Sequence, residues 1–466
     1  MIYSITQRFR CLAWLLTLIL SACQQPGLPN SRPLPLPQDS LVQVYFNHKP
    51  SVEYTEPYRQ QTRAGDDLEK QIVDTITAAK STVDVAVMEL RLPRIAQALV
   101  ARQRAGVKVR VILDKNYSHP LSAIAPNRVA QLPVRERDRY ENEQQLKQLS
   151  GDALTILRGG GVPIIDNSAD ASAGGGIMHH KFVIVDSHTL IVTSANFTVK
   201  QIHGAMNHPA SQGDANNLLK IESQELAALF LEEFNLMWGD GPGGKLEGRF
   251  GLLKPFRPTQ QVKVGNTSIE VNFSPIAKNQ PWEQSGNGLI GKILSTASKS
   301  IDLALFVFSE PRLGDILSTE HQRGVEERVL ISSDFAYRPY SQGLVMQGFA
   351  ATSCQQAFQH PWQNPITTVG VPQLPPGELL HHKFAVIDRQ TAIAGSHNWS
   401  EAANTRNDED LLVIHNATVA AHFEREFERL YANAQLGVPA KMVKKIQRSQ
   451  RRCINQATAL FSQDEN

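Results

Sequence analysis

The sequence has no apolar run long enough to cross a bilayer, little net charge and few cysteines. The apolar run near its N-terminus, Cys11 to Leu20, is shorter than the roughly 20 residues that a membrane-spanning helix needs. A formal net charge of +2 over 466 residues neither requires nor excludes binding to nucleic acid or to an anionic membrane. The chain is long enough for two domains, each with its own core.

The first 23 residues have the charged-then-apolar form of a signal peptide. Arg8 and Arg10 precede the apolar run, which ends in Leu20-Ser21-Ala22-Cys23 and resembles a bacterial lipobox. We therefore expect an exported chain, lipid-anchored to a bacterial membrane through Cys23. An ordinary cleaved signal peptide, which would leave the protein periplasmic or secreted, is the alternative. Residues 24–40 are rich in proline and predict an extended tether.

Few cysteines remain for the folded part of the chain. Cys11 lies in the signal peptide and Cys23 takes the lipid, which leaves Cys354 and Cys453. Export permits a disulfide between these two, but two separate buried thiols fit the sequence equally well.

One short pattern occurs twice in the sequence. Residues 178–186 read MHHKFVIVD, and residues 380–388 read LHHKFAVID. A Ser-x-Asn triplet follows each copy at the same spacing, at 194–196 and at 396–398. In an extended strand alternate side chains share a face, so the first histidine and the lysine of each copy point the same way. Two such sets of donors facing each other would bind the phosphate of one phosphodiester.

These copies resemble the paired HxKxxxxD signatures of the phospholipase D superfamily, which includes phospholipases, endonucleases and lipid phosphotransferases. The resemblance runs from about Leu41 to Tyr431. It implies an α/β fold of two tandem phospholipase D-like αβα sandwich domains with the active site at their interface. We therefore expect domains over residues 41–250 and 251–440. Residues 441–466 form a basic tail that fits lipid head groups, nucleic acid phosphates or a solvated helix face.

Periodicity within the two halves agrees with a repeated unit. Val42–Phe46 and Ile269–Phe273 alternate like strands. A helical pattern beginning at Leu68 follows Asp66 and Asp67, which suit a helix N-terminus. Near the end of each half, large apolar residues step by four and predict a packed helix; they are Leu226, Phe230, Phe234 and Trp238, then Val419, Phe423, Phe427 and Tyr431. Strands and helices alternate, which favours a mixed or mostly parallel sheet covered by helices.

The residues in the motifs suit phosphodiester cleavage without a metal ion or other cofactor. Lys181 and Lys383, with Asn196 and Asn398, supply charge-assisted hydrogen bonds to phosphate. The serines of the triplets, Ser194 and Ser396, are candidates for further substrate contacts. A metal site formed by the adjacent histidines is disfavoured because neither copy has a third ligand at suitable spacing.

By resemblance, His179 is the nucleophile that forms a phosphohistidine and His381 is the general acid. Glu409, after the second motif, lies where the family's histidine-orienting glutamate falls. In the first half Asn216 replaces that glutamate, and Asp214 is the only nearby acidic residue that could take its place. This difference leaves open a reversal of the two histidine roles. The signature aspartates, Asp186 and Asp388, are expected to orient the site rather than to touch substrate.

The leading hypothesis is a phosphodiesterase of phospholipase D type that hydrolyses phospholipid head groups. A nuclease acting on DNA or RNA is the nearest alternative, and a cardiolipin synthase-like phosphatidyl transferase is a further one. A non-catalytic binding protein is disfavoured because both histidines, both lysines and both asparagines are present. We expect a phospholipid membrane surface as partner, nucleic acid as the alternative, no obligate protein partner and a monomer.

Overall fold

The computed structural model describes residues 32–121, 124–168, 176–349 and 361–461. The signal peptide, Cys23 and Cys354 lie outside these ranges, as does the side chain of Cys453. The expectations of a lipid anchor and of a disulfide therefore stay predictions. No helix within the described ranges is long and apolar enough to cross a membrane.

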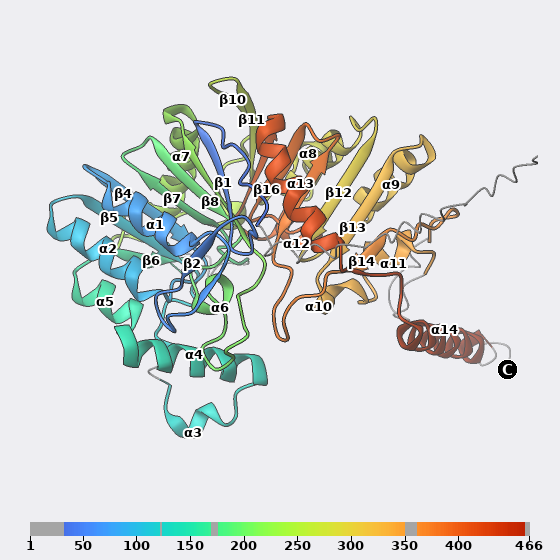
Figure 1. Ribbon diagram of the computed structural model, residues 1–466, viewed down its shortest axis with the longest axis horizontal. Helices are drawn as coiled ribbons and strands as arrows, with labels where there is room; N and C mark the ends of the chain where they lie inside the picture. The colour runs from blue at the N-terminus through green and yellow to red at the C-terminus, as the bar shows by residue number, and fades with distance from the viewer. Residues whose placement is uncertain (1–31, 122–123, 169–175, 350–360, 462–466) are drawn as a thin grey trace, which may run out of the picture.

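Two sheets form the centre of the two halves, and the second repeats the strand order of the first with one more strand at each edge (Figure 1). The first has the order β1-β9-β8-β7-β4-β5-β6, and the second has the order β10-β11-β17-β16-β15-β12-β13-β14-β18. Only β4-β5-β6 and β12-β13-β14 are joined in parallel, and the other pairs are antiparallel. The sheets are thus mixed, as expected, and not mostly parallel. Helices cover them, which confirms the α/β class and the tandem arrangement.

The elements of the first half are β1 Val42–Phe46, β2 Glu53–Thr55, β3 Thr62–Ala64, α1 Leu68–Thr77, β4 Thr82–Val87, α2 Pro93–Arg104, β5 Lys108–Leu113, α3 Pro126–Val129, α4 Val134–Ser150, α5 Ala153–Gly159, β6 Ile164–Asp166, β7 Lys181–Val185, β8 Thr189–Thr193, α6 Val199–Ile202, β9 Asn217–Glu222 and α7 Gln224–Trp238.

The elements that follow are η2 Gly251–Leu253, β10 Gln260–Val264, β11 Thr267–Ser274, η3 Trp282–Gln284, α8 Gly286–Leu294, β12 Ser300–Leu305, α9 Pro311–Gln322, β13 Glu326–Ile331, α10 Ser333–Ala336, α11 Gln342–Met346, β14 Val369–Val371, β15 Lys383–Ile387, β16 Thr391–Gly395, α12 Glu401–Thr405, β17 Glu409–His415, α13 Ala417–Tyr431, β18 Gln435–Leu436 and α14 Ala440–Phe461.

Local sequence explains where several of these elements begin and end. Asp67 is the N-cap of α1, and its side chain accepts the backbone N–H of Lys70 at 2.9 Å. Asp66 instead accepts the N–H of Phe46 and so ties the helix to β1. Helix α2 ends before Gly106, whose φ of +88° allows the chain to turn into β5.

The two halves share one hydrophobic core in addition to a separate core in each. The shared core contains the apolar faces of α7 and α13, including Phe230, Phe234, Phe423 and Phe427. Helix α7 packs on the first sheet and reaches β10, while α13 packs on the second sheet and reaches β1. Figure 1 shows α13 lying between β1 and the second sheet. The predicted aromatic stripes are therefore core residues that also join the halves, which holds the two motifs in fixed register.

The end of the proline-rich segment lies against the second half. The Leu34 carbonyl accepts from Arg425, and the Pro37 carbonyl bonds the ring of His422, both on α13. Residues from Leu34 onward thus lie against α13, within the stretch 24–40 that is expected to form an extended tether. Helix α14, by contrast, projects away from the body of the molecule (Figure 1).

Candidate functional site

The two motif segments meet at the interface, and each pairs with the other half of the chain. Met178 forms a parallel bridge with Asp408, and the N–H of His179 donates to the Asp408 carbonyl at 3.0 Å. In the same way Leu380 bridges Ala215, and the N–H of His381 donates to the Ala215 carbonyl at 3.0 Å. This exchange of short segments places the first histidine of each motif beside side chains supplied by the opposite half.

Glu409 orients the histidine of the first motif. Its Oε2 lies 2.7 Å from Nδ1 of His179 and also accepts the hydroxyl of Ser396 at 2.7 Å. Glu409 follows the second motif in the sequence, but because the segments cross it contacts the histidine of the first motif. Burial, only partly opposed by Glu409, lowers the pKa of His179 to about 4. Burial of Glu409 opposes its ionisation, but the interaction with His179, which includes the hydrogen bond to its ring, and the nearby Lys181 lower the pKa of this carboxyl to about 2. The resting pair is therefore a neutral imidazole and a carboxylate.

His381 has an amide where His179 has a carboxylate. Its Nδ1 lies 3.0 Å from Oδ1 of Asn216, and that oxygen also accepts the hydroxyl of Ser194 at 2.8 Å. The ring of Phe306 lies beside it, with centroids 4.7 Å apart. Burial and the neighbouring Lys383 lower the pKa of His381 well below its usual value. Asp214 does not substitute for a glutamate, because its carboxylate accepts the N–H of Leu379 instead.

The two motif lysines are fully buried and lie beside the histidines. The ammonium of Lys181 donates to the His179 carbonyl at 2.5 Å, and that of Lys383 donates to the His381 carbonyl at 2.7 Å. Burial lowers the pKa of Lys181 to about 8, and burial together with Lys181 lowers the pKa of Lys383 well below its usual value. Nζ of Lys383 also lies 3.1 Å from Nδ1 and 3.2 Å from Nε2 of His381. An anion placed between the two histidines would restore both charges and accept hydrogen bonds from the two ammonium groups.

The motif asparagines present buried polar atoms at the same place. Oδ1 of Asn196 and Oδ1 of Asn398 have no hydrogen-bond partner among the described residues. The backbone N–H of Asn196 is held by the side chain of Gln201 at 2.6 Å, which fixes the residue just beyond β8. Buried polar atoms without partners are uncommon in folded proteins and mark a place where a ligand is expected.

The triplet serines are not positioned for substrate. Ser194 and Ser396 are completely buried, and each hydroxyl donates to the side chain that orients a histidine. Each hydroxyl also accepts a backbone N–H, that of Asn217 and that of Asp410. The prediction of substrate-binding serines is therefore corrected. Their hydroxyls hold the side chains of Asn216 and Glu409, which orient the histidines.

The signature aspartates lie outside the site, at the far ends of β7 and β15. Asp186 has φ of +54° in the tight turn between β7 and β8, and its carboxylate accepts the N–H groups of residues 80–82. Asp388, with φ of +50°, does the same for residues 298–300. Aspartate tolerates this left-handed backbone better than most residues. The sequence predicts that these aspartates orient the site, but their carboxylates instead hold the backbone before β4 and β12.

The second histidine of each motif belongs to an interface network that the sequence did not reveal. His180 lies between Asp410 of the second half, at 3.0 Å, and Glu233 on α7, at 2.9 Å. His382 lies between Asn217, at 3.1 Å, and Glu426 on α13, at 3.0 Å. The two rings are completely buried and contribute packing and hydrogen bonds. No group of three histidine, cysteine, aspartate or glutamate side chains suited to a metal ion occurs in the part of the chain that the structure describes.

Comparison with known proteins agrees with this geometry. A family model described as cardiolipin synthase, PLD-like domain, matches residues 72–238 and 290–431, one stretch in each half. The mitochondrial cardiolipin hydrolase of Mus musculus is 30% identical over 152 residues, which is 32% of this chain and 60% of that protein. The one from Xenopus tropicalis is 30% identical over 182 residues, covering 38% of this chain and 78% of that protein.

The likeness to a solved structure extends over nearly the whole chain. A phosphatidylserine synthase from Haemophilus influenzae superposes with a TM-score of 0.53 at 13% identity. The match covers 92% of this chain and 97% of that one. At this identity the likeness is one of fold, and it extends over both halves.

Proposed function

The chain belongs to the family described as cardiolipin synthase, PLD-like domain, and we propose that it is a phosphodiesterase that hydrolyses phospholipid head groups through a phosphohistidine. The observation that supports this most directly is the unequal support of the two histidines. His179 is paired with a carboxylate and His381 with an amide, while two buried lysines lie between the halves. One site thus contains a strong nucleophile, a separate proton donor and a place for an anion.

Binding of the phosphate group comes first. Lys181 and Lys383 would donate to its non-bridging oxygens, and the side-chain amides of Asn196 and Asn398 would complete the contacts. Because these groups are buried, their interactions with the anion are little screened by water. The lysines supply the charge that other phosphodiesterases obtain from metal ions.

In the first chemical step, Nε2 of His179 attacks phosphorus and forms a P–N bond as the bond to the leaving oxygen breaks. Glu409 accepts the N–H at Nδ1 and stabilises the positive charge that the ring acquires. His381, protonated when the anion is bound, gives its proton to the leaving alcohol. In the second step His381 takes a proton from water, and the water oxygen attacks phosphorus and releases His179.

The side chains that hydrogen-bond the two histidines favour His179 as the nucleophile and His381 as the acid. A carboxylate beside His179 raises its nucleophilicity, whereas a carboxylate beside the acid would hold the proton that the acid must release. Asn216 fixes the orientation of His381 without adding that charge. The order with His179 as nucleophile is thus supported, and the difference between the halves is not a defect of the first motif.

An exposed apolar turn beside the site favours a lipid over a nucleic acid. In η2 and just after it, Leu252, Leu253 and Phe256 are 58%, 48% and 44% exposed. The N–H of Gly251 donates to Asp408 at 2.8 Å, and Asp408 also holds the backbone of His179. Apolar side chains that gather at the rim of a site suit contact with a membrane. We propose a phospholipid surface as partner for a monomeric chain.

The N-terminal sequence supports the same location. We propose that the chain is exported and anchored through Cys23, so that the site faces lipid from the membrane surface. Labelling with radioactive palmitate, followed by a Cys23→Ser variant that loses the label, would test the anchor. A wild-type chain without label would refute it.

The test of the function follows head-group release from phosphatidylglycerol and cardiolipin vesicles in EDTA. Residues 24–466 would be compared in wild-type and His179→Asn forms, with single-stranded DNA as a parallel substrate. Release that persists in EDTA and disappears in the variant is expected. Cleavage of DNA alone would indicate the nuclease, and transfer to an added alcohol without release to water would indicate the transferase. Either result would refute the proposed lipid hydrolysis.

A further inference from the structure

Helix α14 carries charge of one sign only. Between Ala440 and Phe461 the sequence has six cationic residues and no aspartate or glutamate. The cations are exposed; they are Lys441, Lys444, Lys445, Arg448, Arg451 and Arg452. The helix follows β18, at the edge of the second sheet, and projects away from both sheets (Figure 1). The proposed chemistry uses none of these residues.

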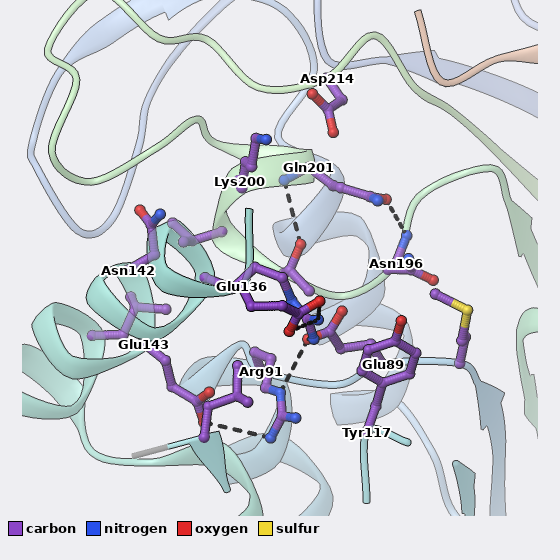
Figure 2. A pocket seen from close by; sticks show the side chains of 16 residues that line it. Glu89, Arg91, Tyr117, Glu136, Asn142, Glu143, Asn196, Lys200, Gln201 and Asp214 are labelled. Carbon is purple, nitrogen blue, oxygen red and sulfur yellow. Dashed lines mark hydrogen bonds and ion pairs between the residues drawn. The ribbon is translucent and has the colours of Figure 1, made fainter. Parts of the chain in front are cut away.

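The charge of α14 is not compensated by the rest of the described chain. None of the six cations forms an ion pair with a carboxylate in the described ranges. Cations on other elements lie beside carboxylates. Arg91 contacts Glu89 at 3.2 Å and Glu143 at 3.4 Å near the site (Figure 2), and the exposed Lys70 contacts Asp74 on α1. Helix α14 therefore presents positive charge that suits an anionic partner.

The cations and the apolar residues of α14 lie on opposite sides of the helix. At 3.6 residues per turn, the six cations fall within roughly one third of its circumference. Met442, Val443 and Ile446 fall on the other side, and all three are only partly buried. This division of charged and apolar side chains is typical of helices that lie in the surface of an anionic bilayer.

The apolar side favours a bilayer over nucleic acid as the anionic partner. Nucleic acid phosphates would attract the cations but would leave the apolar side chains in water. A bilayer has anionic head groups for the cations and acyl chains for the apolar residues, a few ångströms apart. Only the bilayer therefore accounts for both sides of the helix.

We propose that α14 docks the protein on anionic phospholipid bilayers, with Met442, Val443 and Ile446 among the acyl chains and the cations among the head groups. The inference rests on the proposed function for its lipid surface, and it adds the charge of that surface and the segment that recognises it. Docking raises the local concentration of lipid around the protein. It therefore lowers KM on vesicles and leaves the chemical step unchanged.

The test measures sedimentation of chain 24–466 with vesicles of phosphatidylcholine alone and with vesicles that also contain phosphatidylglycerol. Cys23 is absent from this chain, so a lipid anchor cannot contribute. One variant combines Lys444→Gln, Lys445→Gln and Arg448→Gln. Each cation near an anionic surface strengthens binding about fivefold, so this variant should bind phosphatidylglycerol vesicles about 10²-fold more weakly at an unchanged melting temperature. Equal binding by both forms, or no binding by wild type, would overturn the proposal.

The matched control combines Lys70→Gln, Lys278→Gln and Arg389→Gln. It removes the same number of charges from exposed residues that are paired with carboxylates on the body of the protein. Because such pairs contribute little, vesicle binding should change less than about threefold. A loss as large as that of the α14 variant would indicate an effect of total charge and would reject docking by α14.

A third variant, Val443→Ser with Ile446→Ser, tests the apolar side. We expect it to weaken vesicle binding about tenfold and to leave any binding of single-stranded DNA unchanged. Unchanged vesicle binding would exclude insertion. Loss of DNA binding in the cationic variant, with vesicle binding intact, would assign α14 to nucleic acid and overturn the proposal.

Sedimentation separates docking from catalysis because it needs no turnover. Wild type that binds phosphatidylglycerol vesicles but hydrolyses no lipid would refute the proposed hydrolysis and support the docking. If the chain is active, the cationic variant should hydrolyse a soluble short-chain phospholipid at the wild-type rate and show a raised KM on vesicles. Equal losses on both substrates would reject a role in docking.

Discussion

Replacing Glu409 by glutamine tests whether the carboxylate beside His179 is needed for nucleophilic attack. The substitution keeps an oxygen that accepts from Nδ1 of His179 and from Ser396, so the orientation of the ring is preserved. It removes the negative charge that stabilises the ring as it becomes cationic. The experiment therefore tests the charge of Glu409, with little change in the orientation of the His179 ring.

The size of the effect follows from the distance. Nδ1 and Oε2 are 2.7 Å apart, so the centres of charge lie about 4 Å apart. At an effective dielectric constant of about 20, unit charges at this separation attract by about 4 kcal/mol. Since about 1.4 kcal/mol corresponds to a factor of ten, complete loss of this attraction would lower kcat about 10³-fold. The amide dipole of glutamine retains part of the attraction, so we expect kcat to fall between about 10²- and 10³-fold.

The assay is single-turnover hydrolysis of phosphorus-labelled lipid, quenched in alkali, where phosphohistidine survives. The Glu409→Gln variant should form the intermediate slowly, and the label in wild type should map to His179. Glu270→Gln is the control, because Glu270 also contacts a histidine, His415 at 3.2 Å, but at the opposite end of β17 from Glu409. Unchanged kcat in the Glu409 variant with an unchanged melting temperature, or label on His381, would refute the assignment of roles.

Further predictions follow from other contacts. His381→Asn should be rescued by a p-nitrophenyl leaving group, which needs no acid, whereas His179→Asn should not; equal inactivity on that substrate would contradict the assignment. Phosphate binding should take up protons and weaken as pH rises through about 8, because the bound anion raises the depressed pKa of Lys181. Calorimetry in buffers of different ionisation enthalpy measures the proton uptake. Identical heats of phosphate binding in all buffers would contradict it. Asp186→Ala should lower the free energy of unfolding by about 1–2 kcal/mol and leave kcat unchanged. Hydrogen bonds from residues 80–82 lower the pKa of Asp186 to about 2. The loss of stability should therefore shrink as pH falls toward about 2. Leu252→Ser should weaken activity on vesicles severalfold and leave activity on a soluble short-chain lipid unchanged.

Short-range pattern was enough to predict much of the fold. The helix beginning at Leu68, the strands that follow the two HHK triplets, and the closing helices all appear where periodicity and capping residues placed them. Each of these depends on neighbours within one or two turns of the chain. The repeated order of such elements also indicated two similar sheets before any contact was known.

Contacts between distant segments could not be read in the same way. Glu409 follows the second motif in the sequence, yet it lies 2.7 Å from His179, 230 positions earlier. Asp186 belongs to the signature and is predicted to orient the site, whereas it follows the far end of β7 and binds the backbone of Lys80. Sequence spacing shows which side chains share a strand face. It does not show which end of the strand reaches the site, or which half supplies the partner.

The crossed segments explain why two motifs of nearly identical sequence can perform different chemistry. The segments that lead into β7 and β15 carry the same histidines and lysines. The difference in chemistry therefore comes from the residues that contact these histidines. Glu409 and Asp410 face the first motif, and Asn216 and Asn217 face the second. Because each pair belongs to the half opposite the histidines that it contacts, a change in one half alters the reactivity of the other. The nucleophile and the acid are therefore defined only in the assembled interface, where carboxylates lie on one side and amides on the other.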